Sequence, residues 1–200
     1  MNTTELNKVM KELTLPTKYT KAGKLAYYRL NHETGASILV GIYLDSSIDS
    51  NLFFVQYFVQ CLYIPFTTYV FSLGDRIGKH WEVTDIPEIN QKLNDFNSFD
   101  NLNTFSDFLP YLEQNIYYGE STGRNQCFAL THFVQKNYSK SLQFLNDIIA
   151  LKNHVNSEWF KQDIKNAEQM KYLIDDGKYQ MGIEQILKWQ SETTTAIKLR

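Results

Sequence analysis

The densest group of polar side chains follows directly after the most apolar stretch of the chain. Asp75, Arg76, His80 and Trp81 lie close together there, with glycines at positions 74 and 78. An arginine guanidinium presents paired hydrogen-bond donors to a carboxylate or phosphate, and a tryptophan ring can form an apolar wall beside it. The group predicts a pocket for a small anion at the end of a sheet, with Asp75 orienting Arg76. The more common alternative is structural: Arg76 forms an ion pair with Asp75 or a nearby carboxylate and stabilises the turn.

The two glycines of this segment favour an explanation by backbone geometry. Glycine is the usual residue where the chain needs a positive φ or a close approach of two backbones. No strand–GxxxxGK[ST]–helix pattern is present, so nucleotide triphosphate chemistry has little support.

Two glutamines precede this group on one face of an expected strand. Gln56 and Gln60 alternate with Phe58, so all three share a face. The glutamines can line a polar groove next to Arg76. Their more common role is to face solvent or to reach backbone groups.

Candidate metal ligands and nucleophiles are scattered. None of the histidines has a partner at the spacing of a known metal motif; they are His32, His80, His132 and His154. We therefore expect no metal and no cofactor, although a site assembled only by folding stays open. No nucleophile elbow of recognisable context is present, because the run Gly119 to Gly123 matches GxSxG only within an expected linker and not between a strand and a helix. Carboxylate pairs such as Asp75 with Glu82 or Glu113 with Glu120 arise by chance in a chain of this composition.

Composition indicates a folded protein with little attraction for nucleic acid. Of the 200 residues, 43% are hydrophobic and 21% are charged, and the net charge is −2 without any basic run. Phosphate neutralisation therefore cannot drive binding, and we expect no nucleic-acid partner. Cys61 and Cys127 lie in apolar surroundings, which predicts buried free thiols in a reducing cytoplasm.

Neither a signal peptide nor a membrane span is expected. The N-terminal segment is polar, and the most apolar stretch, 52–73, contains Gln56, Gln60 and Pro65. These groups would be left unpaired in hydrocarbon. The sequence predicts a soluble, cytoplasmic protein.

The first half predicts one short helix and an antiparallel sheet. Apolar residues at helical spacing indicate a helix over 3–13, with Thr3 or Thr4 as the N-cap. Period-two alternation predicts strands at 36–44 and 52–63. Further strands are expected at 24–30 and 66–72, with Pro65 as the break before the last. The connections are too short for parallel crossovers, so we expect a meander.

Helices follow the sheet. Asp85 and Glu88 resemble a capping pair for a helix that continues to Phe96, and 104–115 is helical if it starts near Ser106 or bends at Pro110. From Ser121 onward the pattern is helical, with Gly177 at a helix C-terminus. We predict an α+β fold: a domain at 1–117 with an antiparallel sheet of about four strands packed by helices, then a hinge at 117–124. A helical tail of about four helices follows at 120–200.

The tail contains a weak internal repeat with an offset of 41 residues. The pattern of a tyrosine, a small residue and two aliphatic residues at Tyr138, Ser141, Leu142 and Leu145 recurs at Tyr179, Gly182, Ile183 and Ile186. Each copy looks like the second helix of a tetratricopeptide unit, although the spacing is longer than in that repeat. Two interpretations stay open: two stacked helix pairs, or ordinary helices packing on a sheet.

Part of the chain resembles the bacterial domain of unknown function 4304. The motifs that carry the resemblance are Phe58-Val59-Gln60 with Leu62, the run Ser72 to Gly78 with Trp81, and Leu109-Pro110-Tyr111-Leu112-Glu113. It covers about residues 1–115, and it departs from the family in having a single Trp81 and Tyr111 in place of phenylalanine. The resemblance implies an α+β fold and a bacterial origin. The family has no established activity, so no site residue is carried over from it.

Two functions are consistent with the sequence. The first is a non-enzymatic protein-interaction module with a possible protein partner, because no catalytic constellation is present and tyrosines are abundant. The alternative is a binder of, or enzyme for, a small anionic metabolite that uses Asp75, Arg76, His80, Trp81, Gln56 and Gln60. Whether catalysis occurs stays open, with a non-enzyme favoured, and the sequence does not determine the oligomeric state.

Overall fold

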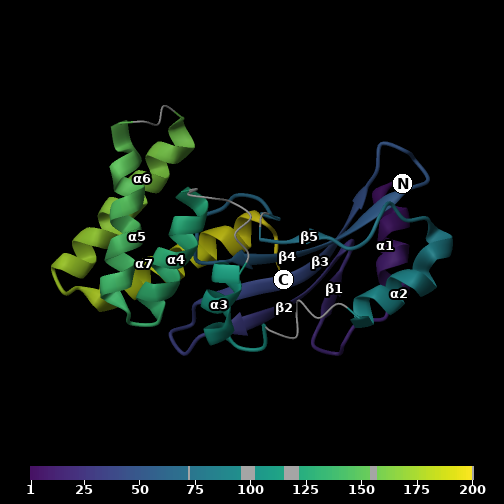
Figure 1. Ribbon diagram of the computed structural model, residues 1–200, viewed down its shortest axis with the longest axis horizontal. Helices are drawn as coiled ribbons and strands as arrows, with labels where there is room; N and C mark the ends of the chain where they lie inside the picture. The colour runs from purple at the N-terminus through teal and green to yellow at the C-terminus, as the bar shows by residue number, and fades with distance from the viewer. Residues whose placement is uncertain (72, 96–101, 115–121, 154–156, 200) are drawn as a thin grey trace. The chain divides into compact units, whose positions relative to one another are not determined.

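The computed structural model describes residues 1–71, 73–95, 102–114, 122–153 and 157–199 (Figure 1). The chain forms two compact units. The first comprises Met1–Leu30, Ile38–Gln60 and Val70–Asp107, and the second comprises Asn31–Ser37, Cys61–Tyr69 and Phe108–Arg200. The division predicted from the sequence, at 117–120, falls outside the described residues.

A five-stranded antiparallel sheet confirms the predicted α+β class. Its strands run in sequence order, β1-β2-β3-β4-β5. They are β1 Thr20–Ala22, β2 Leu25–Asn31, β3 Ser37–Ser46, β4 Phe53–Cys61 and β5 Asp75–Arg76. The predicted strands 24–30, 36–44 and 52–63 are confirmed, whereas the two short edge strands β1 and β5 were not predicted.

The predicted strand at 66–72 is wrong, since residues 66–71 form no strand. Phe71 instead packs against the face of the sheet, with its ring 4.7 Å from that of Tyr43 and 5.1 Å from that of Phe58. The N–H of Val70 donates to the side-chain Oε1 of Gln60 at 3.1 Å, where a strand would need a backbone carbonyl. The segment is rich in β-branched and aromatic residues, but these contacts with the sheet face decide its backbone conformation. Ser72 lies outside the described residues.

Helix α1, Thr3–Glu12, has its N-cap one residue before the predicted caps Thr3 and Thr4. Asn2 is the N-cap: its side chain accepts from the N–H of Glu5 at 3.0 Å, and Glu5 accepts from the N–H of Asn2 at 2.7 Å. This reciprocal pair is a capping box, so Thr3 and Thr4 are not needed as caps. The buried stripe of α1 is Leu6, Val9 and Met10.

Asp85 has a different role from the predicted one. Its Oδ2 accepts from the N–H of Glu82 at 2.9 Å and closes the short 3-10 helix η1, Val83–Asp85, ahead of α2, Ile86–Asp95. It therefore does not pair with Glu88 in a capping box. Phe96, the predicted end of this helix, lies outside the described residues.

The segment around Pro110 is helical, as predicted. A 3-10 turn η3, Phe105–Asp107, leads into α3, Phe108–Gln114. Pro110 lies in the first turn of α3, where an intrahelical N–H is not required. The start near Ser106 was therefore the correct one of the two predicted possibilities.

The described residues of the helical tail form four α-helices, which confirms the prediction. They are α4 Thr122–Val134, α5 Tyr138–Ala150, α6 Glu158–Asp175 and α7 Tyr179–Ala196, with a short 3-10 helix η4, Leu151–Asn153, after α5. Gly177 ends α6 with φ 66°, as the sequence predicted. Within the described residues no helix has both the length and the apolar character needed to cross a membrane.

Candidate functional site

Arg76 is held in place by the edge of the sheet in the first unit. In the ladder between β4 and β5 it lies opposite Gln56. The next residue, Ile77, donates its N–H to the carbonyl of Val55 at 2.7 Å. Asp75 accepts from the backbone N–H of Arg76 at 2.7 Å. The aspartate thus fixes the backbone of Arg76, while both side chains lie on the exposed strand.

The guanidinium of Arg76 stacks on an aromatic ring. Its central carbon lies 3.7 Å from the centroid of the Phe54 ring. Within the described part of the chain, every ion pair of the kind Lys or Arg with Asp or Glu uses a lysine, so Arg76 has no carboxylate partner there. The described residues therefore do not show the ion pair that the structural alternative predicts for Arg76.

His80 contacts the same ring. The imidazole centroid lies 4.2 Å from that of Phe54, with the planes tilted by 46°. His80 is exposed and Phe54 is half-buried. Two side chains that can donate hydrogen bonds thus share one aromatic platform, Phe54, which the sequence reasoning did not single out.

Trp81 does not form the predicted wall of this site. It is fully buried and forms an antiparallel bridge with Phe53, whose side chain faces the side of the strand opposite to Phe54. Its Nε1–H donates to the carbonyl of Ile77 at 2.8 Å, so the ring is part of the core of the first unit. A Cβ on Gly78, where φ is 75°, would lie 2.2 Å from this ring. The glycine therefore serves backbone geometry, as expected.

The two glutamines of β4 have different surroundings. Gln56 is half-buried, and its position opposite Arg76 places both side chains on the face that carries Phe54. Gln60 is only 2% exposed and its side chain binds the backbone of Val70. Gln56 belongs with the Arg76 group, whereas Gln60 is structural. Of the predicted residues, the fold therefore brings together Arg76, His80 and Gln56 on one platform.

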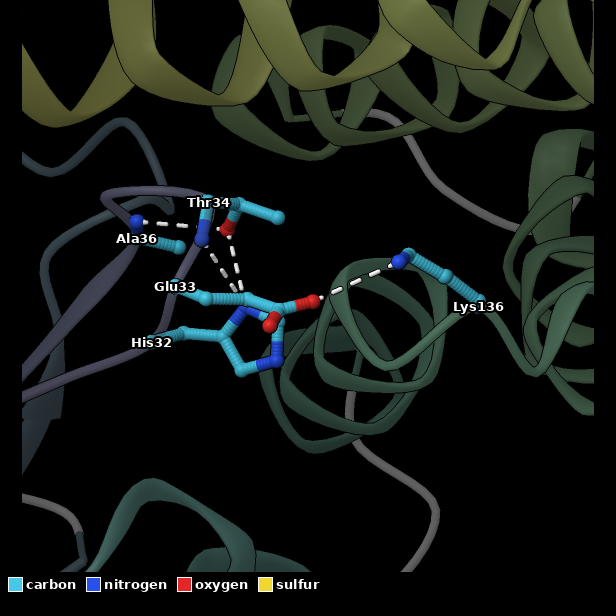
Figure 2. Close-up of polar contacts among 5 residues, drawn as sticks. All are labelled: His32, Glu33, Thr34, Ala36 and Lys136. Atoms are coloured by element: carbon cyan, nitrogen blue, oxygen red, sulfur yellow. Dashed lines mark hydrogen bonds and ion pairs between the residues drawn. The ribbon is translucent and has the colours of Figure 1, made fainter.

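A second polar group lies at the tip of the β2–β3 hairpin, in the second unit (Figure 2). The Thr34 hydroxyl lies 3.0 Å from Nδ1 of His32, and Lys136 donates to Oε1 of Glu33 at 3.3 Å. Burial lowers the pKa of His32 more than the neighbouring Glu33 raises it. The N–H of Thr34 donates to Nδ1 of His32, and the N–H of Ala36 donates to Oγ1 of Thr34. His32 and Thr34 therefore belong to a local turn that orders the hairpin tip.

The two cysteines form part of a buried network in the second unit. Cys61 and Cys127 are both free thiols, and the two thiols form a hydrogen bond. The hydroxyls of Tyr63 and Thr131 lie 2.6 Å apart beside them. Burial raises the pKa of the Cys61 thiol, which disfavours the reactive thiolate.

The sequence reasoning also missed three exposed large apolar residues that lie near one another along the chain in the second unit. Tyr172 is 53% exposed, Tyr179 is 39% exposed and Met181 is 54% exposed. The Tyr179 ring stacks on that of Tyr138, with centroids 3.9 Å apart and an angle of 8° between the planes. Lys178 lies between Tyr172 and Tyr179 along the chain and donates to the Tyr172 hydroxyl at 2.7 Å. We call Tyr138, Tyr172, Tyr179 and Met181 the tyrosine surface.

Some predicted features fall outside the described residues. They are His154, Glu120 and most of the hinge at 117–124. Of the described residues, no group of three or more histidines, cysteines, aspartates and glutamates is arranged to hold a metal ion.

No family model, curated protein or solved structure matches the chain. The resemblance to domain of unknown function 4304 stays a prediction that depends on the motifs quoted above.

Proposed function

We propose that the protein is a non-enzymatic interaction module that binds a protein partner through the tyrosine surface. One observation carries the proposal. Among the described residues five large apolar side chains are strongly exposed, and three of them lie within ten positions around the α6–α7 turn: Tyr172, Tyr179 and Met181. Grouped exposed apolar residues of this kind mark interaction sites more often than isolated ones do.

The composition of this surface fits a protein partner. Tyrosine and methionine are enriched at the centres of interfaces, and a rim of charged residues surrounds them. Here the charges on the rim are already paired, Lys171 with Asp175 at 3.0 Å and Lys178 with Asp176 at 2.8 Å. A rim with both signs gives no net attraction for phosphates, so the surface favours protein over nucleic acid.

The rings are also pre-organised. Tyr179 is stacked on Tyr138, and Tyr172 is bonded to Lys178, whose Nζ also lies 4.8 Å from the Tyr172 ring centroid. A ring already held in place loses little conformational entropy when a partner binds. A bacterial accessory role in the cytoplasm, such as neutralising or escorting the partner, is part of this proposal.

Photo-crosslinking in cells of the source organism tests the proposal. A benzophenone amino acid at position 181 is expected to give one discrete crosslinked species, while the same group at Glu158, an exposed position at the start of α6, serves as the matched control. The double variant Tyr172→Ser with Tyr179→Ser, combined with the label at 181, is expected to abolish the crosslink without unfolding the chain.

Two outcomes would contradict the proposal. Equal crosslinking from positions 181 and 158 would mean that the tyrosine surface is not selective. A crosslinked species containing only a second copy of the chain, with concentration-dependent sedimentation, would assign the surface to self-association instead.

A further inference from the structure

We propose that Arg76, His80 and Gln56 form a binding site for a small carboxylate or phosphate anion beside the Phe54 ring. The site lies wholly in the first unit and does not depend on the tyrosine surface. It differs from the pocket predicted from the sequence, because Phe54 and not Trp81 provides the aromatic platform.

The guanidinium of Arg76 is positioned by the Phe54 ring. Stacking at 3.7 Å from the Phe54 centroid occupies one face of the Arg76 guanidinium. The five N–H donors of a guanidinium lie around its edge and in its plane. A stacked guanidinium therefore keeps the geometry that binds two oxygen atoms of a carboxylate or phosphate side by side.

The carboxylate next to Arg76 along the chain already accepts a backbone hydrogen bond. Asp75 is the carboxylate nearest along the chain, but one of its oxygens already accepts from the backbone N–H of Arg76. Adjacent residues of a strand point to opposite faces, so the carboxylate of Asp75 is directed away from the face on which Arg76 meets Phe54. In the described residues the positive charge of Arg76 is therefore not neutralised by an ion pair.

Further hydrogen-bond donors lie on the same face as Arg76. The imidazole of His80, 4.2 Å from the Phe54 centroid, can donate through a ring N–H. Gln56, directly opposite Arg76 in the ladder, brings a carboxamide NH2 to the same face. Three types of donor around one ring, with a net positive charge, are suited to an anion with two or three oxygen atoms.

The geometry also explains why an arginine stands at this position. A lysine carries the same charge but has a single ammonium that neither stacks flat on a ring nor presents a planar fork. Arg76→Lys is therefore expected to retain general attraction for anions while it loses the paired hydrogen bonds.

Nuclear magnetic resonance on the full chain tests the proposal. The probes are inorganic phosphate and succinate, titrated at constant ionic strength against chloride, with detection at the arginine Nε–H groups, the side-chain NH2 of Gln56 and the backbone amides of residues 75–81. Both probes are expected to give saturable shifts at Arg76 and at Gln56, and chloride is expected to give only the small uniform change that screening produces.

Variants identify the groups that bind. Arg76→Lys and Phe54→Leu are each expected to weaken binding about tenfold, roughly the effect of losing one charge-assisted hydrogen bond or the ring that orients it. Arg29→Lys, at an exposed position of β2, is the matched control and is expected to leave the affinity unchanged. Melting temperatures are measured in parallel for each variant.

The result that overturns the proposal is equally specific. Shifts at Arg76 that are no larger than those at Arg29, or that fail to saturate, would show only nonspecific screening. Unchanged affinity in Arg76→Lys would exclude recognition by the guanidinium. If Phe54→Leu alters the fold, His80→Asn replaces it, because the His80 ring is exposed.

Discussion

Tyr138 and Tyr179 stack face to face, with ring centroids 3.9 Å apart and planes 8° apart. They are the first residues of α5 and α7 and occupy equivalent positions in the internal repeat. The repeat therefore places the same residue at the start of two helices, and the fold brings the two copies into contact.

The turns before these tyrosines have the same geometry. Lys136 has φ 62° and Gly177 has φ 66°, and each follows the end of a helix. After α4 the N–H of Asn137 donates to the carbonyl of His132, and after α6 the N–H of Lys178 donates to the carbonyl of Leu173. Both are Schellman turns. The burial of Ser141 with Leu145 and of Gly182 with Ile186 also repeats, so the second helices of the two pairs are equivalent in structure.

The tyrosine stack should be measurable as a coupling energy. Aromatic pairs contribute about 0.5–1.5 kcal/mol beyond the area that they bury. In a double-mutant cycle of Tyr138→Ala and Tyr179→Ala, measured by urea unfolding, we expect a coupling in that range. Tyr138→Phe, which keeps the ring, is the control. Strictly additive single effects would show that the two rings do not stabilise one another.

The left-handed residue of the first turn predicts a stabilising substitution. A positive φ costs a non-glycine residue about 1–2 kcal/mol, so Lys136→Gly should raise the free energy of unfolding by about 0.5–1 kcal/mol. Gly177→Lys should lower it by about 1 kcal/mol or more. The ion pair between Lys136 and Glu33 joins side chains that are 66% and 73% exposed, so its loss matters little. Glu33→Gln measures that loss separately, and a destabilising Lys136→Gly would contradict the argument.

How well the sequence predicts each strand depends on where the strand's stability comes from. The strands of 24–30, 36–44 and 52–63 were predictable because each is long and carries buried apolar residues at period two. The segment at 66–72 also contains β-branched and aromatic residues, but Phe71 packs its side chain against Tyr43 and Phe58 and the segment forms no strand. The strand β5 has only two residues and exists because β4 provides a partner. Neither the missing strand at 66–71 nor the presence of β5 can be predicted from the local sequence pattern.

The sequence predicted which residues belong to the candidate site better than it predicted how they are arranged. The sequence identified Arg76, His80 and Gln56, but Trp81 was the nearer aromatic residue along the chain. Only the pairing register between β4 and β5 shows that Phe54 lies under the guanidinium and that Trp81 faces the core. Register is set by tertiary structure, so sequence spacing alone selected the wrong ring.

Two glycines in the tail predict opposite effects of the same substitution. A Cβ on Gly182 would lie 2.2 Å from Cζ of the Phe133 ring, which is itself fully buried. Gly182→Ala should therefore destabilise the second unit by about 1–3 kcal/mol. Nothing lies within 4 Å of a Cβ on Gly123 in α4, so Gly123→Ala should be neutral or stabilise by up to about 1 kcal/mol, because alanine favours a helix.

Thermal unfolding of Gly182→Ala and Gly123→Ala under identical conditions checks both predictions. The comparison isolates the contact with Phe133, since the added methyl group is the same in each. Gly182→Ala combined with Phe133→Leu should recover part of the loss. Equal melting temperatures for Gly182→Ala and Gly123→Ala would mean that the Phe133 ring can move away from the added methyl group without lowering the free energy of unfolding.

The last prediction concerns acid sensitivity of the second unit. His132 is buried in α4, and its ring stacks 5.8 Å from that of Phe144. Burial lowers the pKa of His132, the positive charge of Lys140 lowers it further, and Glu113 opposes both. Within the described residues Nδ1 of this ring has no hydrogen-bond partner, so a proton there gains nothing in return for its desolvation.

The sign of the effect follows from this lowered pKa. The folded pKa lies below the unfolded one, so the neutral imidazole contributes stability above the unfolded pKa, and this contribution is lost as the pH falls through the folded pKa. We expect the wild-type free energy of unfolding to fall between about pH 7 and pH 5. His132→Phe should flatten that fall because phenylalanine binds no proton, and its ring can keep the stack with Phe144. His80→Asn, which removes an exposed imidazole, is the control. Parallel pH profiles for the wild type and His132→Phe would show that protonation of His132 does not limit stability in acid.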